Sequence, residues 1–167
     1  RGFHTASAGI IENSPTAIAE ALSRNYAIEV DLQETADGRA IVFHDDDLDR
    51  LADASGPVIA RKADELVGIR MKSGSDRLWL FEELLEQVAG RVTLVVEVKS
   101  LNRADAQSAF VRRICDIVRG YKGPLVLKSF DPDMLSVMRA YAPEIPRGIV
   151  ADRTPNEGEY RKLTRMD

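Results

Sequence analysis

The sequence is poor in the residue types that mark several protein classes. Its 167 residues include a single cysteine, Cys115, which excludes an intrachain disulfide and a cysteine-based metal site. Cys115 falls on the apolar side of a helical pattern, so we expect it to pack in the core. Only two histidines are present, His4 and His44, and imidazole chemistry from this chain must use one of them.

Long apolar runs and basic stripes are also lacking. No stretch approaches the roughly 18 apolar residues of a membrane-spanning helix, so no membrane span is expected. The net charge is −4, without the basic stripe that neutralises phosphates, so we expect no nucleic-acid partner. No charged and then apolar leader pattern follows Arg1, although the sequence begins without an initiator methionine. A cytoplasmic location is the default expectation.

What is present is the composition of a soluble globular protein, with 44% hydrophobic and 30% charged residues. The length suits one domain with a sizeable core, and we predict a single domain over residues 1–167. Helical spacing of apolar residues predicts helices at 15–25, 62–67, 81–89, 103–119 and 132–141. Apolar or alternating runs predict strands at 27–32, 40–43, 92–98, 124–130 and 146–151.

The alternation of strands and helices indicates parallel βαβ units. A closed eight-stranded barrel needs roughly 250 residues, more than this chain has. We therefore predict an α/β fold, a TIM (β/α)8 barrel whose first strand and last strands lie outside the chain. An open doubly wound sheet is the alternative, but no glycine-rich phosphate loop follows a predicted strand. The polar run 45–77 is predicted to be a cap-like insertion within the barrel domain.

Charged side chains interrupt two of the predicted strands. Glu29 and Asp31 alternate with aliphatic residues in one strand, and His44 follows the next strand. Glu97 and Lys99 alternate with valines in a third strand, which otherwise reads as buried on both faces. Catalytic groups of parallel barrels sit where strands end. Three carboxylates converging there would suit a hard divalent cation, Mg²⁺ or Ca²⁺.

Each of these residues also has a purely structural interpretation. Glu97 can be a partner of Lys99, and a histidine at a strand end can simply be hydrogen-bonded. The acidic run 45–47 can be a solvated turn, and Arg50 can pair with Asp49. The joint occurrence of these residues at strand ends is what favours a site.

The chain resembles the glycerophosphodiester phosphodiesterases, which are TIM-barrel enzymes. The similarity rests on short motifs in the correct order along nearly the whole sequence. They are Arg1-Gly2, Glu12-Asn13-Ser14, Glu29-Val30-Asp31, Asp37-Gly38, Val42-Phe43-His44-Asp45, Leu48-Asp49-Arg50, residues 78–88, Glu97-Val98-Lys99 and Ser129-Phe130-Asp131.

The resemblance implies metal-dependent hydrolysis of glycerophosphodiesters to glycerol 3-phosphate and an alcohol. The implied metal ligands are Glu29, Asp31 and Glu97, with Mg²⁺ or Ca²⁺ as the cation. The implied catalytic residues are His44 as general acid/base and Arg1 and Lys99 as phosphate contacts. The insertion would cover the glycerol end of the substrate.

Two departures from the family pattern bear on these expectations. The family's other catalytic histidine would stand immediately before Arg1, and this sequence does not contain it. His4 lies three residues further along and does not substitute for it. Trp79 and Leu80 stand where the family usually has Pro-Thr, so Trp79 either lines the substrate site or packs in the core.

Two other functions stay open. One is a non-catalytic binding or regulatory relative that keeps the barrel and the carboxylates. The other is a phospholipase C-type phosphodiesterase acting on lipid head groups, which the polar cap disfavours because it has no amphipathic or aromatic tip. We expect a small-molecule glycerophosphodiester as the partner and make no prediction of oligomeric state.

Overall fold

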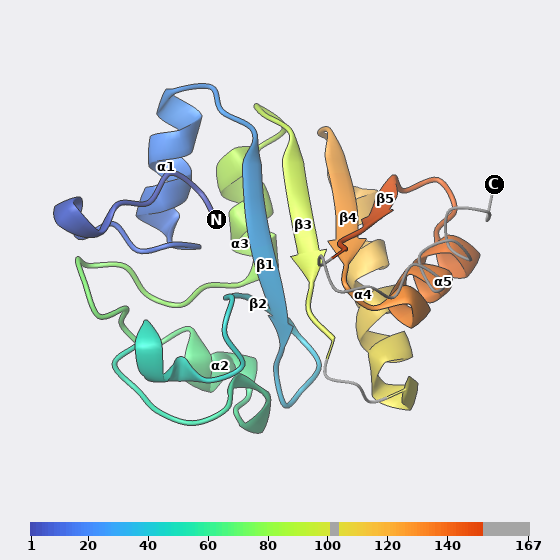
Figure 1. Cartoon of the computed structure of the whole chain (residues 1–167), viewed down its shortest axis with the longest axis horizontal. Coiled ribbons are helices and arrows are strands. Elements are labelled where there is room, and N and C mark those ends of the chain that lie inside the picture. The colour runs from blue at the N-terminus through green and yellow to red at the C-terminus, as the bar shows by residue number, and fades with distance from the viewer. Residues whose placement is uncertain (101–103, 152–167) are drawn as a thin grey trace.

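The computed structural model describes residues 1–100 and 104–151. Its centre is one five-stranded sheet in the order β2-β1-β3-β4-β5 (Figure 1). The strands are β1 (Ile28–Glu34), β2 (Ala40–Val42), β3 (Leu94–Val98), β4 (Leu125–Ser129) and β5 (Arg147–Ile149). All five predicted strands are therefore confirmed, although their ends differ by a few residues.

The predicted helices are also present. They are α1 (Pro15–Ser23), α2 (Ala63–Leu66), α3 (Phe81–Val88), α4 (Ala104–Gly120) and α5 (Pro132–Tyr141), with single 3₁₀ turns at Ala6–Ala8, Leu48–Arg50 and Val58–Ala60. The predicted start of the fourth helix at position 103 lies outside the described residues. Within the described part of the chain, none of the helices is both long enough and apolar enough to cross a lipid bilayer.

Local sequence explains where two of these helices begin. Ser14 accepts a hydrogen bond from the backbone N–H of Ala17 at 3.1 Å, and Pro15 occupies the first helical position of α1. Asp131 accepts one from the N–H of Asp133 at 2.9 Å and precedes Pro132 in α5. Both arrangements satisfy an N–H group that the first helical turn leaves without a partner.

Strand direction differs from the prediction at one point. Strands β1, β3, β4 and β5 are parallel to their neighbours, but β2 pairs antiparallel with β1. The five runs therefore supply four parallel strands of the eight in a closed barrel. His44 does not follow the carboxyl end of a parallel strand, as the sequence suggested. The turn around Gly38 reverses the chain, so β2 runs back along β1 as a hairpin and His44 follows the end of this antiparallel strand.

One face of the sheet forms the main hydrophobic core. Helices α3 and α4 lie behind the strands in Figure 1, and residues from α1, α3, α4 and α5 join the strand residues in a single buried cluster. Among its members are Ile18, Val30, Leu32, Phe81, Leu84, Val96, Val98, Phe110, Ile114, Leu127 and Met134. Cys115 belongs to the same cluster, as predicted, and burial raises the pKa of its thiol to about 11.

The opposite face of the sheet is polar. Alternation along the strands places Glu29, Asp31, Gln33, Glu97 and Lys128 on it. Val95 and Val126 share this face and are only partly buried. The prediction that the strand at 92–98 is covered on both faces is therefore not met by the described residues. Function is to be sought on this polar face.

The segment 45–77 buries several apolar side chains, although its overall composition is polar. It has a second hydrophobic cluster of its own, which joins the cap to β2. The cluster contains Ile41, Phe43, Leu48, Ala52, Val58, Ala63, Leu66, Met71, Leu78 and Leu80. Isolated bridges between Asp47 and Pro57 and between Ala52 and Met71 close its loops. The segment is thus packed against the sheet next to His44.

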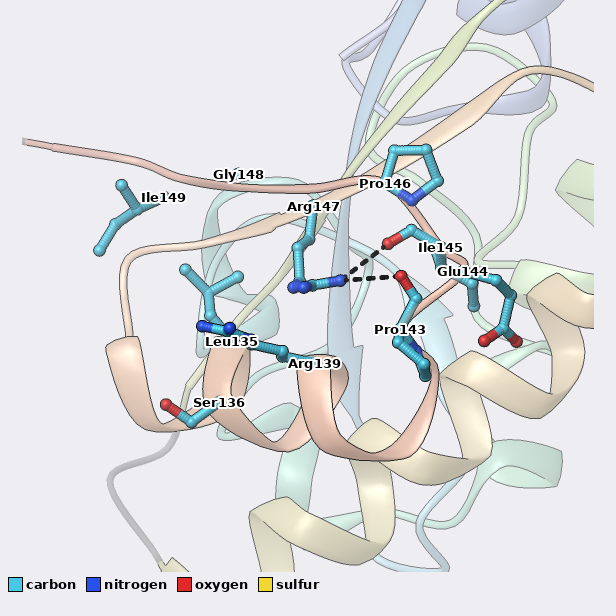
Figure 2. Close-up of a pocket in the computed structure, with 10 residues that line it drawn as sticks. All are labelled: Leu135, Ser136, Arg139, Pro143, Glu144, Ile145, Pro146, Arg147, Gly148 and Ile149. Atoms are coloured by element: carbon cyan, nitrogen blue, oxygen red, sulfur yellow. Dashed lines mark hydrogen bonds between the residues drawn. The ribbon is translucent and has the colours of Figure 1, made fainter. Parts of the chain in front are cut away.

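A pocket of about 380 Å³ lies between α5 and β5 (Figure 2). Arg147 reaches across it and donates hydrogen bonds to the backbone oxygens of Pro143 at 3.4 Å and Ile145 at 3.3 Å. None of the site residues predicted from the sequence lines this pocket. The chemistry has to be looked for elsewhere.

Candidate active site

Three carboxylates meet on the polar face because of strand register. Asp31 of β1 lies directly opposite Glu97 of β3, and Glu29 precedes Asp31 by two residues on the same face. One oxygen from each lies within 4.8 Å of the other two. Asp31 is only 1% exposed and Glu97 only 4%. Buried carboxylates need cationic partners, and an all-oxygen set of this size fits Mg²⁺ or Ca²⁺.

Lys99 contacts two of these carboxylates. Its ammonium group lies 2.9 Å from Asp31 Oδ1 and also contacts Glu97. The pairing of Glu97 with Lys99, the structural alternative, is therefore present. An ammonium group has three N–H donors, so Lys99 can bridge both acids and still donate to a further anion.

Lys128 is a residue for which the sequence suggested no role. It lies opposite Glu97 in the pairing of β3 with β4, and its Nζ is 3.0 Å from Glu29 Oε1 and 3.1 Å from Glu97 Oε2. Burial lowers the pKa of Lys128, but hydrogen bonds to these two acids outweigh burial and raise the pKa above its ordinary value. A lysine inside an otherwise apolar strand, Leu125–Ser129, was the signal that could have found it.

Asn13 holds Asp31 from the other side. Its Nδ2 donates to Asp31 Oδ2 at 2.9 Å, and its Oδ1 accepts from the Asp31 backbone N–H at 3.3 Å. Asn13 adopts a left-handed backbone conformation (φ 59°) and is fully buried. Trp79 donates from Nε1 to the Asn13 carbonyl at 2.8 Å and packs in the core cluster. Trp79 thus packs in the core and supports the site indirectly.

Arg1 joins the carboxylate cluster through its guanidinium group. Its Nε lies 3.3 Å from Asp31 Oδ2, and its Nη1 donates to Glu12 at 2.9 Å. Gly2 allows the backbone to pass close to Ala17 next to the cluster. It has φ +73°, and a Cβ at this position would lie 2.9 Å from the backbone of Ala17. The glycine therefore sets where Arg1 can reach.

His44 is held by an ionised acid. Its Nδ1 lies 2.7 Å from Asp45 Oδ1, and Arg50 pairs with both oxygens of Asp45 at 2.6 and 2.8 Å. Hydrogen bonds from Arg50 lower the pKa of Asp45 to about 2, against a smaller effect of burial. A carboxylate with that pKa only accepts at neutral pH, so Nδ1 of His44 carries the proton. Nε2 is then the unprotonated nitrogen, which can accept a proton.

Arg50 connects this histidine with Arg1. It donates to Glu12 at 2.9 Å as well as to Asp45. Burial alone would raise the pKa of Glu12, but the charges of Arg50 and Arg1 outweigh burial and lower the pKa below its ordinary value. The suggested pairing of Arg50 with Asp49 is wrong, since Asp49 instead accepts from the backbone N–H of Gly56 at 2.9 Å. Arg50 and Glu12 are 38 residues apart in the sequence, and only the folded loop brings their side chains together.

The acidic run after His44 is also structured. Gln33 donates from Nε2 to the backbone oxygen of His44 and to Asp46 Oδ1, both at 3.0 Å. The interpretation of residues 45–47 as a solvated turn therefore fails for Asp45, whereas Asp46 and Asp47 are exposed. His4 is exposed and lies 3.3 Å from the Gly2 carbonyl, so it does not join this group.

Two pockets adjoin the cluster and share Lys99. One, of about 500 Å³, is lined by His44, Asp45, Asp46, Asp47, Asp49, Arg50 and Lys99. The other, of about 370 Å³, is lined by Glu97, Val98, Lys99, Ser100, Phe130, Asp131 and Pro132. An anion held at Lys99 could therefore extend a substituent to either side.

Comparison with known proteins identifies the family. A model of the glycerophosphoryl diester phosphodiesterase family matches residues 1–164, nearly the whole chain. The chain belongs to the glycerophosphoryl diester phosphodiesterase family. The resemblance seen in the sequence motifs is thereby confirmed.

Solved structures of glycerophosphodiester phosphodiesterases share the fold. An Oleispira antarctica phosphodiesterase in complex with the product sn-glycerol-3-phosphate is 21% identical, with a TM-score of 0.81, and the match covers 98% of this chain and 70% of that one. A glycerophosphodiester phosphodiesterase of Agrobacterium tumefaciens is 29% identical, with a TM-score of 0.65 over 81% of this chain and 59% of that one. These likenesses confirm the α/β fold as a partial TIM barrel.

A curated relative of the chain is the Bacillus subtilis protein YqiK. It is 26% identical over 130 residues, which are 74% of this chain and 54% of YqiK. The chain therefore spans about half the length of the curated relative that it matches.

Proposed function

We propose that the protein hydrolyses glycerophosphodiesters to glycerol 3-phosphate and an alcohol. The observation that carries the proposal is the gathering of Glu29, Asp31, Glu97 and Lys99 on one sheet face, with His44 and Lys99 lining one pocket beside it. Family membership supports it, as does the glycerol 3-phosphate bound by the Oleispira relative.

Glu29, Asp31 and Glu97 would hold a divalent cation, Mg²⁺ or Ca²⁺. Their oxygens are close enough to share one ion, and carboxylate oxygens are the ligands that Mg²⁺ and Ca²⁺ prefer. When bound, such an ion polarises phosphate oxygens and stabilises charge that develops on them.

Arg1 and Lys99 would bind the phosphate. Both are anchored by Asp31, so their positive charges are oriented before the substrate arrives, which avoids reorganisation during the reaction. The two pockets beside Lys99 offer one space for each ester substituent. The pocket under the cap, next to His44, would take the glycerol end.

His44 would act as the general acid and base. With Nδ1–H donated to Asp45, its Nε2 can take a proton from an attacking hydroxyl or return one to the departing alcohol. Asp45 stays ionised at neutral pH and stabilises the imidazolium that forms. The same histidine serves whether the substrate's own glycerol hydroxyl or water attacks phosphorus.

The test is turnover of glycerophosphocholine and glycerophosphoethanolamine by the intact protein. We expect EDTA to abolish activity and His44→Ala to lower kcat about 10²–10⁴-fold, because proton transfer at the ester oxygens is lost. His4→Ala is the matched control and should leave kcat unchanged, since His4 contacts only the exposed Gly2 carbonyl.

Several results would contradict the proposal. Turnover that persists in EDTA and in His44→Ala would remove both the metal and the histidine from the mechanism. Binding of the diester without turnover would favour a binding or regulatory protein. Faster reaction on phospholipid vesicles than on soluble diesters would favour a phospholipase C-type activity.

A further inference from the structure

Lys128 occupies an unexpected place for a strongly basic side chain. It is fixed by the register of the sheet, where it stands opposite Glu97, so its side chain must share the polar face whatever rotamer it adopts. Its ammonium group contacts Glu29 at 3.0 Å and Glu97 at 3.1 Å, and its side chain is only 22% exposed.

The two lysines of the cluster face different surroundings. Lys99 lines both pockets, so its ammonium group can reach a substrate phosphate. Lys128 lines neither pocket and contacts only the acids Glu29 and Glu97 among the ion pairs of the described residues. Its charge is therefore directed at two of the three candidate metal ligands.

The balance of charge determines what Lys128 does to a metal ion. Glu29, Asp31 and Glu97 contribute three negative charges, and the side chains of Arg1, Lys99 and Lys128 contribute three positive ones. A divalent cation bound by these oxygens would lie within a few ångströms of the Lys128 ammonium group. Like charges at that distance repel strongly where water is largely excluded. The ammonium group also occupies carboxylate lone pairs that a metal ion needs.

We propose that Lys128 is an internal counter-cation that competes with the divalent cation for Glu29 and Glu97. This inference rests on the proposed metal role of these acids. Lys128 keeps the buried acids paired, and a metal ion has to displace its ammonium group to bind. The protein therefore binds Mg²⁺ or Ca²⁺ more weakly than the same three carboxylates would without Lys128.

Calorimetric titration of the intact protein with Mg²⁺, and separately with Ca²⁺, tests this competition. Lys128→Gln keeps a polar side chain of similar reach but removes the charge, and we expect it to bind the metal at least tenfold more tightly, about 1.4 kcal/mol. Lys128→Arg keeps the charge and should stay within about threefold of the wild type. Lys122→Gln, on an exposed loop residue, is the surface control and should not change affinity.

A second measurement follows metal binding in the wild-type protein and needs a variant only to assign one signal. In NMR spectra of ¹⁵N-labelled lysine side chains, the Lys128 ammonium signal should shift on metal addition as its contacts with Glu29 and Glu97 are lost. The signal is assigned by its absence in Lys128→Arg.

The outcomes separate the two proposals. If the wild type binds metal but Lys128→Gln binds no more tightly, or the Lys128 signal is unmoved, the competition is disproved while the proposed function stands. If neither protein binds Mg²⁺ or Ca²⁺, the metal site and the competition both fall. Tighter metal binding by Lys128→Gln, with affinity little changed in Lys128→Arg and Lys122→Gln, supports the competition.

Discussion

Asp31 is the residue on which most contacts of the site converge. It is 1% exposed and is paired with Arg1, Asn13 and Lys99 at distances of 2.9–3.3 Å. A buried carboxylate is stable only when its oxygens are paired in this way. Arg1 and Lys99 are thereby oriented by a group that is itself a candidate metal ligand.

Asp45 predicts a dependence of stability on acid pH. Its pKa is about 2 in the folded protein and 3.8 ordinarily, so it stabilises the fold fully above the ordinary value. The contribution is lost as the pH falls from about 4 through about 2. The difference of nearly two pKa units corresponds to about 2 kcal/mol, and partial exposure reduces this to about 1–2 kcal/mol.

Urea unfolding of the wild type and Asp45→Asn measures this contribution. The variant should be less stable by about 1–2 kcal/mol at pH 7, and the difference should roughly halve at pH 3. A difference that stays constant down to pH 3 would show that the ionised state of Asp45 does not stabilise the fold.

The sequence predicted single residues where alternation alone decides the face. Glu29, Asp31, Glu97 and Lys99 all follow from the period of two within a strand. Lys128 did not, because its partnership with Glu97 depends on the register between β3 and β4. Arg50 was paired wrongly, since its partner Glu12 approaches only through folding of the loops.

Among elements, the β1–β2 hairpin joins the sheet to the cap. Asp37 in its turn accepts hydrogen bonds from the Thr35 hydroxyl at 2.6 Å and from the backbone N–H of Ala63 at 2.9 Å. Ala63 begins α2 in the cap, so Asp37 caps that helix from outside the segment. The hairpin that precedes His44 is therefore tied to the segment 45–77.

Asp37→Ala should loosen this connection. We expect a loss of about 1–2 kcal/mol in the free energy of unfolding, because the first turn of α2 loses its side-chain acceptor. Hydrogen exchange should also be faster at residues 63–66. Asp53→Ala, an exposed acid of the same cap, is the control. Equal stability of the two variants would contradict the role of Asp37.

The cap shows where element prediction from sequence ends. Its short helix at 62–67 and its position were predicted, but its hydrophobic cluster was not. The buried residues of the cap are divided among single helical turns and the loops between them, so they recur with neither the strand nor the helix period over any length. Without that period, a packed segment reads as a polar loop.

At the scale of the whole molecule, the central sheet has two faces that differ in chemistry. Helices and apolar side chains cover one, and the other gathers the charged residues of the site. The α/β class and the order of elements follow from the sequence because parallel strands need helical crossovers. The direction of β2 was missed, because the strand at 40–43 was counted among the parallel units although the turn at Asp37-Gly38 reverses the chain before it.

Metal binding should be visible in the stability of the whole protein. Buried acids gain a cation, so Mg²⁺ or Ca²⁺ at about 100 times its dissociation constant should stabilise the intact protein by about 2.7 kcal/mol and raise Tm by several degrees. Glu97→Gln should abolish the shift, because it removes a ligand. A thermal scan in which metal leaves Tm unchanged for the wild type would contradict a metal site.

The antiparallel hairpin has a consequence for how the site assembles. Pairs such as Leu32 with Val42 close a short loop and bring Phe43, the residue before His44, to Asp31, whose carbonyl accepts from the Phe43 N–H at 3.0 Å. Hairpins of this kind form in about 1–10 μs, and their loop-closure entropy is small. Asp31 meets Glu97 only when a long crossover is complete, which is intrinsically slower. The proposed proton-transfer half of the site is thus local in the chain, and the proposed cation-binding half forms only with the sheet.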